Sequence, residues 1–481
     1  MTFTEIIEKI DGYVWGVPLI VGIIFVGVLL SVRTGFIQIF HLPKAFRYMF
    51  HTEEDGEGEV TSFGALCTAL SATIGTGNIV GVATAIAAGG PGALFWMEVA
   101  AFFGMATKYS EGLLAVKFRE IGKDGKVLGG PFYYIEKGMG KNFKWLAVLF
   151  AIFGALAGIM GIGTITQING IVSAVQNFFD PNSRHIAFSL PGNDYTWATV
   201  IAAIVVTVFV ALVVIGGIKR ISKVSEIVVP FMVIVYVVSA LTLVFTNIEK
   251  IPGAVAMVCK AAFYPQAILG GIAGITVKIA MKDAMQMGIA RGIFSNEAGL
   301  GSAPIAAADA KTKEPVRQGL VCMTGTFLDT IVVCTMTGLS IVLTGSWEEA
   351  VSGTLKGAAV TTMAFERGLP FNDSVCSLIL MLCLAFFAFT TILGWAYYAE
   401  RCLEYLLGNK KGVLMAYKVL YIVAVFIGPF LTVSIVWTLA DIFNALMAIP
   451  NLIALIALSG VVAKETKSYF NRLKSGEITD R

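Results

Sequence analysis

The chain has 481 residues, of which 57% are hydrophobic and 14% are charged, and its mean hydropathy is +0.80. These values lie far from those of soluble proteins and are typical of a polytopic membrane protein. The net charge of +3 gives no support to a nucleic-acid partner. Three histidines and seven scattered cysteines indicate neither a metal site nor a disulfide framework. We therefore expect no enzyme, no organic cofactor and no obligate protein partner.

Apolar stretches long enough to cross a bilayer recur along the chain, so the expected fold is an all-α membrane protein with eleven transmembrane helices. The predicted spans are 13–33, 62–88, 92–118, 145–177, 197–217, 224–247, 261–290, 316–345, 374–401, 414–438 and 441–463. The glycine-rich turn Gly89–Gly92 joins the second span to the third.

Lysine and arginine are distributed unevenly between the loops. If the N-terminus lies outside, the inside segments hold 28 Lys and Arg residues and the outside segments hold 6. Cytoplasmic loops of membrane proteins are enriched in these residues. We therefore expect a multi-pass protein of the cell membrane, with its N-terminus outside and its C-terminus in the cytoplasm.

The second span contains Ser71–Gly81, in which Gly75, Gly77 and Gly81 stand among small polar residues. Glycine weakens a helix interior by roughly 1 kcal/mol relative to alanine. A broken helix exposes backbone amides and carbonyls, and at membrane depth this is tolerated where they are buried or line a cavity. The pattern indicates a binding site for a small solute and an ion, or else a kinked helix that packs closely through small residues.

A second glycine-rich segment opens the seventh predicted span, where Pro265 can start a helix and Gly270, Gly271 and Gly274 can break it. Two interrupted spans in corresponding positions indicate an inverted-repeat transporter. We accordingly divide the single transporter domain into an extra N-terminal helix, two five-helix repeats and a cytoplasmic tail. Their predicted bounds are 13–33, 62–247, 261–463 and 464–481.

The adjacent hydroxyls of Thr390 and Thr391 lie in the ninth span. Threonine in membrane helices commonly bonds a carbonyl one turn back. The alternative is that both hydroxyls bind Na⁺ together with carbonyls such as that of Phe387, since Na⁺ is a hard cation that prefers oxygen ligands. Trp395 lies one turn beyond Thr391, where it either caps a small pocket or serves as a packing aromatic.

Two further polar side chains lie inside apolar spans. Asp329, in the eighth span, is a functional candidate because an intramembrane carboxylate is expensive, although pairing with a structural partner is the alternative. The amide of Gln167 is suited equally to a substrate contact and to a hydrogen bond between helices.

The polar segment Arg291–Ser302 follows the seventh predicted span. Ser295 or Asn296 can cap a short helix that has Glu297 in its first turn. We expect a structured cytoplasmic loop here, with a gating role as the alternative.

The chain resembles the alanine or glycine:cation symporter family, the sodium:alanine symporters, over residues from about Val14 to Lys464. The motifs that carry this resemblance are Gly75-Thr-Gly-Asn-Ile79, Gly89-Gly-Pro-Gly92, Gly129-Gly-Pro131, Arg291-Gly-Ile-Phe-Ser-Asn-Glu-Ala-Gly299 and Gly301-Ser-Ala-Pro304. The resemblance implies membership of the amino acid–polyamine–cation group, with a LeuT-like five-plus-five inverted repeat.

The resemblance also implies roles for individual residues. Backbone amides in the first broken helix would hold the substrate carboxylate, and carbonyls of the second would receive its ammonium group. The implied substrate-binding residues are Thr76, Gly77, Gln167, Gly270, Gly271, Ala273 and Trp395. The implied Na⁺ ligands are Ser71, Thr73, Ile74, Asn78, Asp329, Phe387, Thr390 and Thr391.

The expected function is Na⁺-coupled symport of a small neutral amino acid, alanine or glycine, into the cell by alternating access. Another neutral amino acid such as glutamine is the alternative substrate, and H⁺ is the alternative coupling ion, with Asp329 as its carrier. A channel would need a continuous polar pore and a membrane enzyme would need a nucleophile–base or metal set, and the sequence favours neither.

Overall fold

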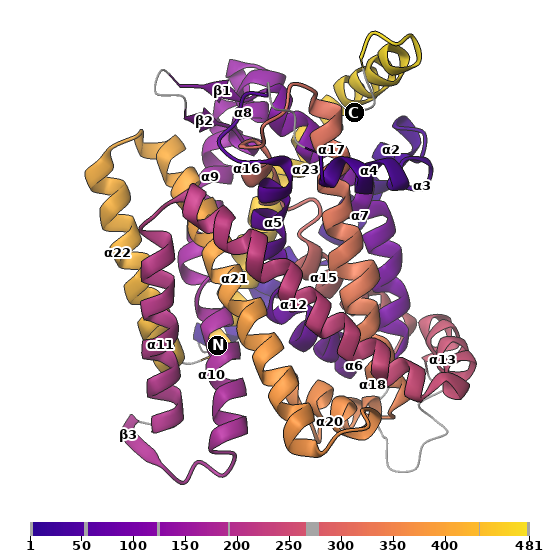
Figure 1. Cartoon of the computed structure of the whole chain (residues 1–481), viewed down its shortest axis with the longest axis vertical. Helices are drawn as coiled ribbons and strands as arrows, with labels where there is room; N and C mark the ends of the chain where they lie inside the picture. The colour runs from indigo at the N-terminus through magenta and orange to yellow at the C-terminus, as the bar shows by residue number, and fades with distance from the viewer. Residues whose placement is uncertain are drawn as a thin grey trace.

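A computed structural model describes residues 3–51, 56–122, 126–190, 193–265, 279–431 and 433–478, which form a helical bundle (Figure 1). The helices before residue 247 are α1 (Phe3–Val14), α2 (Val17–Arg33), α3 (Ile37–Phe40), α4 (Leu42–Met49), α5 (Ser62–Thr73), η1 (Gly77–Gly81), α6 (Val82–Gly89), α7 (Gly92–Lys117), α8 (Pro131–Tyr133), η2 (Tyr134–Met139), η3 (Lys141–Phe143), α9 (Lys144–Met160), α10 (Ile165–Phe179), α11 (Trp197–Val214) and α12 (Ile218–Thr246). The later helices are η4 (Ile248–Lys250), α13 (Ile251–Phe263), α15 (Met281–Asn296), α16 (Ala303–Ala307), α17 (Pro315–Thr326), η5 (Phe327–Cys334), α18 (Thr335–Leu343), α19 (Trp347–Val351), α20 (Ala358–Gly368), α21 (Asp373–Leu407), α22 (Lys411–Ile427), η6 (Gly428–Phe430) and α23 (Val433–Lys474).

The helical membrane architecture expected from the sequence is confirmed. Within the described ranges, eight helical segments are long and apolar enough to cross a membrane, and the bent pair formed by α5 and η1–α6 makes a ninth if it is one span. The count of eleven and the inverted repeat stay predictions.

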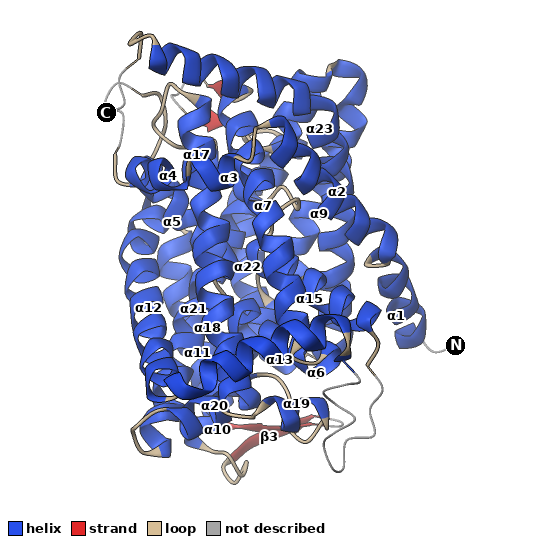
Figure 2. Ribbon diagram, turned by 90° about the vertical axis from the view of Figure 1, so that its right-hand side faces the viewer, coloured by secondary structure: helices blue, strands red, loops and turns tan. Residues whose placement is uncertain are grey.

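Two ends of the bundle are distinguished by their short elements (Figure 2). At one end, called here the α4 end, lie α4 and the hairpin of β1 (Glu120–Ile121) and β2 (Val127–Leu128), in which Glu120 pairs with Leu128. At the other, called the β3 end, lie α20 and the hairpin of β3 (Ile186–Leu190) and β4 (Asn193–Thr196). In that hairpin Leu190 pairs with Asn193, and an irregularity shifts the register near Ile186.

The predicted discontinuity in the second span is confirmed. Helix α5 begins at a side-chain cap, because Thr61 accepts a hydrogen bond from the amide of Gly64 at 2.8 Å. It ends at Thr73, and the chain continues as η1 from Gly77 with a bend of 51°. After α6, Gly90 adopts a φ of 68° and turns the chain directly into α7. That conformation favours glycine because it has no Cβ.

The seventh span differs from its prediction of a helix over 261–290. Helix α13 ends at Phe263, and α15 begins at Met281 and runs to Asn296. The chain then leaves helical geometry at Glu297–Ser302 and resumes as α16. The predicted break at Gly270–Gly274 lies outside the described residues.

A third interruption divides the predicted span 145–177. Helix α9 ends at Met160 and α10 begins at Ile165, so the glycine-rich segment Gly161–Thr164 separates them. The hydroxyl of Thr164 donates to the carbonyl of Ile159 at 2.6 Å and thereby satisfies one of the acceptors freed at the end of α9.

The centre of the bundle is formed by helices with few exposed side chains. Helix α7 packs against α15 and α17, and α5 packs between α12 and α21. In Figure 1, α12 crosses in front of α5 and α15, and in the space-filling view α11 and α12 make up much of this face. The exposed residues of α12 include Ile227, Phe231, Ile234 and Val238, which suit contact with lipid.

Close packing between α5 and α21 depends on Gly394. A Cβ added there would lie 2.6 Å from the Cβ of Ala72 and 2.8 Å from its backbone nitrogen. Backbone atoms cannot yield as a flexible side chain can, so even one methyl group would separate two helices that position the polar residues described below.

We expect Gly394→Ala to destabilise the protein by about 1–3 kcal/mol, the usual range for overpacking. The measurement is the melting temperature of the detergent-purified protein. Gly412→Ala in α22 is the matched control, because nothing lies within 4 Å of the added Cβ. A melting temperature for Gly394→Ala equal to that of the control would contradict the inferred packing constraint.

Candidate functional site

Polar groups from five parts of the chain meet at the interrupted helices. They come from the α5–η1 break, from α10, from the α15–α16 break, from η5 and from α21. Thr76, Asn78, Gln167, Asp329 and Thr391 are each at most 1% exposed. Because buried polar groups need partners, the pattern of hydrogen bonds among them defines the site.

Two side-chain amides hold the α5–η1 break open. The Oδ1 atom of Asn78 accepts from the amide of Gly75 at 2.9 Å, and Oε1 of Gln167 accepts from the amide of Thr76 at 3.1 Å. The Nε2 group of Gln167 donates to the carbonyl of Ile162 in the α9–α10 connection. Gln167 therefore lies at the break and links it to the interruption between α9 and α10.

The two adjacent threonines of α21 face different neighbours. The Thr391 hydroxyl lies 3.2 Å from the carbonyl oxygen of Ile74 and 3.0 Å from that of Phe387. The Thr390 hydroxyl bonds the Phe387 carbonyl at 3.0 Å and lies 3.6 Å from the sulfur of Met232 on α12. The structure thus brings Thr391, Phe387 and Ile74 together and turns the Thr390 hydroxyl away from the break.

Asp329 lies in η5, where its carboxylate receives three side-chain hydrogen bonds. Asn78 Nδ2 donates to Oδ1 at 2.8 Å, and the hydroxyls of Ser295 and Thr330 donate to Oδ2 at 2.9 and 2.7 Å. Thr330 in turn accepts from Asn296 Nδ2 at 3.0 Å. Asp329 and Asn78 therefore form one cluster, joined by residues of the α15 end.

Glu297 ends α15 in a left-handed conformation, with a φ of 56°, and is fully buried. Its Oε1 accepts from the indole Nε1 of Trp395 at 2.9 Å, and its Oε2 accepts from the Ser302 hydroxyl at 2.5 Å. Non-glycine residues with positive φ are uncommon and concentrate at functional sites. Trp395 thus ties α21 to the α15–α16 break.

The remaining predicted Na⁺ ligands lie in α5. The Ser71 hydroxyl donates to the Thr68 carbonyl at 2.7 Å, and the Thr73 hydroxyl lies 3.3 Å from the carbonyl of Ala69. Both bonds run back along α5, so the structure does not direct these hydroxyls to the break. The three substrate candidates Gly270, Gly271 and Ala273 lie outside the described residues.

The expectation of a cytoplasmic loop at Arg291–Ser302 is wrong. Residues 295–302 are all buried, and four of their side chains bond within the site. The polar residues Lys282, Asp283 and Arg291 lower the hydropathy of this segment, so hydropathy alone does not identify it as a membrane span. Gly299 and Gly301, with φ of 89° and 80°, repeat the glycine pattern of the first break. These glycines are the sequence signal that locates the α15–α16 break.

A cavity of about 270 Å³ lies beside the break, along η1 and α6. Helix α6 lies toward the β3 end (Figure 2). Its lining residues are Thr76, Gly77, Val80, Gly81, Thr84, Arg291 and Phe294. Drug-sized ligand pockets are roughly 300–1,000 Å³. The cavity therefore suits a smaller solute.

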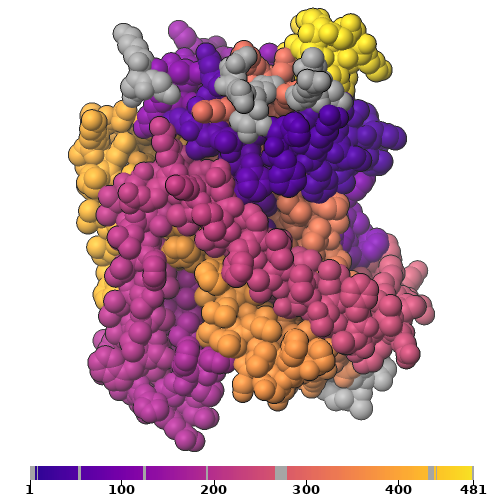
Figure 3. Space-filling model, viewed as in Figure 1, coloured from indigo at the N-terminus to yellow at the C-terminus, as the bar shows by residue number. Residues whose placement is uncertain are grey.

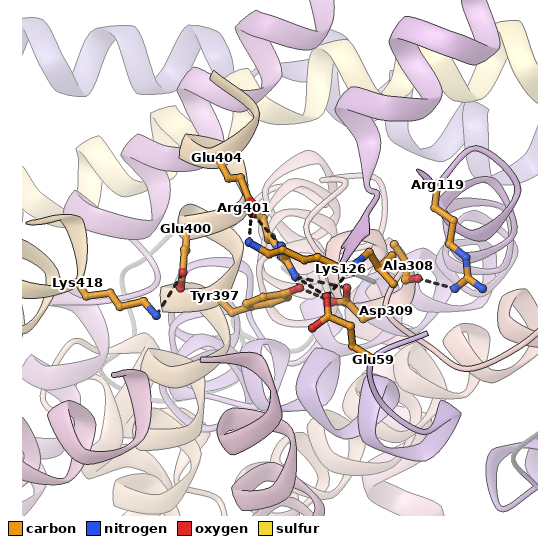
Figure 4. Close-up of polar contacts among 11 residues, drawn as sticks. Glu59, Arg119, Lys126, Ala308, Asp309, Tyr397, Glu400, Arg401, Glu404 and Lys418 are labelled. Atoms are coloured by element: carbon orange, nitrogen blue, oxygen red, sulfur yellow. Dashed lines mark hydrogen bonds and ion pairs between the residues drawn. The ribbon is translucent and has the colours of Figure 1, made fainter. Parts of the chain in front are cut away.

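A network of charged residues lies toward the α4 end (Figure 4). Arg401 of α21 contacts Glu404 at 2.8 Å, Glu59 at 3.2 Å and Asp309 at 3.7 Å, and the Tyr397 hydroxyl also donates to Asp309. Burial raises the pKa of Asp309 to about 7, while the charge of Arg401 acts to lower that pKa. The network thus ties the scaffold helix α21 to the segments that precede α5 and follow α16.

Arg119 joins those two segments to each other. Its guanidinium donates to the carbonyls of Ala308 at 2.6 Å, Ala310 at 2.7 Å and Thr312 at 2.8 Å, and also to that of Glu57. The amide of Val60 adds a backbone bond to the carbonyl of Asp309 at 3.2 Å. At this end of the bundle the segment that precedes α5 is therefore bonded to the segment that follows α16.

The chemistry of the central site is that of binding. Its groups offer carbonyl, hydroxyl and carboxylate oxygens, which suit a hard monovalent cation, and backbone amides at a helix break, which suit a carboxylate. Among the described residues, no group of three or more His, Cys, Asp and Glu side chains is placed to hold a metal ion.

Comparison with known proteins identifies the family. The model of the sodium:alanine symporter family matches residues 1–481. An uncharacterized transporter of Haemophilus influenzae is 53% identical over 474 residues, covering 98% of both chains. The sodium/alanine symporter AgcS of Methanococcus maripaludis is 44% identical over 483 residues, covering 99% of both. A probable sodium/glutamine symporter, GlnT of Bacillus subtilis, is 34% identical over 478 residues, covering 98% of this chain and 93% of the relative.

The fold is also similar to that of a solved transporter. The crystal structure of MhsT in complex with L-phenylalanine matches with a TM-score of 0.56, covering 86% of this chain and 99% of MhsT. The two are 12% identical, so this likeness concerns the fold alone, which is LeuT-like. From the sequence matches, the chain belongs to the sodium:alanine symporter family, whose members are multi-pass membrane transporters that couple amino-acid movement to Na⁺ and are not enzymes.

Proposed function

We propose that the protein carries alanine or glycine together with Na⁺ into the cell by alternating access. The observation that carries the proposal is the meeting of Thr391 and Gln167 at the α5–η1 break. A Cβ added at Gly75 would lie 2.4 Å from the Thr391 hydroxyl and 3.0 Å from Gln167 Oε1. The Thr391 hydroxyl and the Gln167 amide thus meet backbone groups at a point where the helix lacks its own backbone hydrogen bonds.

Na⁺ binds between α5 and α21 in this proposal. Its principal ligands are the carbonyls of Ile74 and Phe387 and the hydroxyl of Thr391, which lies 3.2 Å from the first carbonyl and 3.0 Å from the second. Ser71, Thr73 and Thr390 stay proposed ligands that reach the ion through carbonyls or after rotation of a side chain. Asn78 and Asp329 form the second proposed cation position, and there H⁺ is the alternative to Na⁺.

The amino acid binds at Thr76 and Gly77 in this proposal, with its carboxylate on the amides of the break and with Gln167 and Trp395 beside it. The Thr76 amide is bonded to Gln167, and in this proposal the substrate carboxylate replaces that bond. The cavity of about 270 Å³ has room for a free amino acid. AgcS is named a sodium/alanine symporter, which favours alanine as the substrate. GlnT is named a probable sodium/glutamine symporter, so glutamine stays the alternative substrate.

The proposed coupling between Na⁺ and the amino acid follows from their contact with the same α5–η1 break. Na⁺ would fix the Ile74 carbonyl and thereby orient the neighbouring amides for the carboxylate, so each ligand strengthens binding of the other by the same factor. The membrane potential contributes roughly 2.3 kcal/mol per charge per 100 mV. We propose that α5–α6 and α15–α16 rock against the remaining helices during transport.

The charge of the loops supports a cytoplasmic α4 end and an N-terminus outside. Lys282 and Arg291 are counted among the 28 inside residues, but they lie in α15 and not in a loop. The excess of Lys and Arg at the α4 end persists without these two residues.

The proposal is tested by uptake of radiolabelled L-alanine into liposomes that hold the purified protein. An inward Na⁺ gradient should drive uptake, replacement of Na⁺ by K⁺ should abolish it, and glycine should compete better than glutamine. Uptake driven equally by a pH gradient without Na⁺ would overturn the proposed ion, and competition by glutamine alone would overturn the proposed substrate.

Thr391→Ala should raise the Na⁺ concentration for half-maximal uptake by roughly ten- to hundredfold, because a ligand bond to a charged group is worth about 1.5–3 kcal/mol. Thr390→Ala is the matched control, since its hydroxyl faces Met232, and it should have the smaller effect. The order of preference among alanine, glycine and glutamine should be unchanged. Equal half-saturation by Na⁺ in the wild type and Thr391→Ala would remove Thr391 from the site.

Asp329→Asn should weaken Na⁺ activation and reduce the apparent number of Na⁺ ions in the uptake curve. The change keeps the size of the side chain, removes its charge and leaves Asn78, Ser295 and Thr330 in place. The measurement is uptake against Na⁺ concentration at several pH values. If the variant instead retains its Na⁺ curve and loses its pH dependence, Asp329 carries H⁺ rather than Na⁺.

A further inference from the structure

The cavity beside the break contains a charged group that the proposed transport mechanism does not use. Arg291 is the only charged residue among the described residues that line the 270 Å³ cavity, which also contains Thr76 and Gly77. The guanidinium lies 5.6 Å from the ring centre of Phe294, one turn nearer the break. It therefore lies in the space between the β3 end and the proposed substrate site.

Two polar atoms of the cavity-lining residues lack partners. Nε of Arg291 and the hydroxyl of Thr76 are both buried and have no hydrogen-bond partner among the described residues. Leaving a buried donor unpaired costs about 1–3 kcal/mol. Two such atoms beside the same cavity indicate that a polar solute completes their hydrogen bonds.

The existing partner of Arg291 is weak enough to be exchanged. Its Nη1 lies 3.5 Å from Oδ2 of Asp441 on α23, whereas charge-assisted hydrogen bonds are typically about 2.7–2.9 Å. Asp11 of α1 also acts on Arg291 through its charge. A guanidinium has five donors in a planar fork, so one long contact leaves donors that suit a second carboxylate.

We propose that Arg291 binds the carboxylate of the arriving amino acid in this cavity, exchanging it for Asp441, before that carboxylate reaches the amides of Thr76 and Gly77. The Thr76 hydroxyl then contacts the polar end of the same solute, and Val80 and Phe294 contact its side chain. This step rests on the proposed function and adds a residue that selects solutes with a free carboxylate.

The test compares Arg291→Gln, Arg291→Lys and Asp441→Asn in liposome uptake of radiolabelled L-alanine, with L-alaninamide as a competitor that lacks the carboxylate. Arg291→Gln should raise the KM for alanine by roughly ten- to hundredfold and reduce the discrimination against alaninamide. Arg291→Lys keeps the charge but not the fork, so its KM should be intermediate. Asp441→Asn should leave the KM unchanged or lower it, because the guanidinium gains freedom.

A role for Arg291 solely in the ion pair with Asp441 gives a different result. Arg291→Gln and Asp441→Asn would then change uptake alike, without altering discrimination against alaninamide, and the proposal would be overturned. Half-saturation by Na⁺, measured at an alanine concentration that saturates each variant, should stay at its wild-type value in all three variants. Absence of Na⁺-driven alanine uptake by the wild type would contradict the proposed function itself, whereas wild-type uptake with an unchanged KM in Arg291→Gln contradicts only the role of Arg291.

Discussion

The structure depends on satisfying the backbone groups that are freed where a buried helix breaks. At Gly75 and Thr76 the amides cannot bond within the helix, and the hydrocarbon of a membrane offers them no partner. Asn78 and Gln167 accept from them, and Thr391 donates to the carbonyl of Ile74. These side chains come from three different elements, because Asn78 lies in η1, Gln167 in α10 and Thr391 in α21. The break therefore fixes the relative positions of α5, α10 and α21.

The same requirement shapes the second break. Glu297 adopts a left-handed conformation, and its carboxylate is bonded by Trp395 and Ser302. Ser295 and Asn296 connect the end of α15 to Asp329 and Thr330 in η5. The two breaks therefore share partners through Asp329, which also bonds Asn78. A cation or substrate that changes one break consequently changes the bonds available to the other.

Charged side chains inside the bundle are also arranged so that neighbouring groups balance their charge. Lys108 of α7 is 3% exposed, and its ammonium group acts on the carboxylates of Glu111, Glu297 and Asp329. Glu111 also accepts from Asn451 of α23 at 2.6 Å. Intramembrane charges of this kind are expensive and are retained where they serve function. Lys108 thus balances part of the negative charge around the proposed cation positions and connects it to α23.

The sequence by itself determined the membrane class and the interruption of the second span, and it selected Gln167, Asp329, Thr391 and Trp395 as candidates. Glycine and isolated polar residues in an apolar span carry that information, because both are unfavourable there unless they serve a local purpose. Only the tertiary structure decided that Arg291–Ser302 lies in the core. Lys282, Asp283 and Arg291 lower the hydropathy of α15, so a criterion based on lipid exposure fails for a helix that packs against protein on α6 and α7.

The tertiary structure also separated residues that are equivalent in sequence. Thr390 and Thr391 are neighbours of one type, yet helical geometry places successive residues about 100° apart, so only Thr391 faces the break. Glu297, which accepts from Trp395, lies 98 residues away along the chain, and Ser295, which donates to Asp329, lies 34 residues away. Composition and spacing therefore show which side chains need a partner, whereas helix packing decides which partner each one finds.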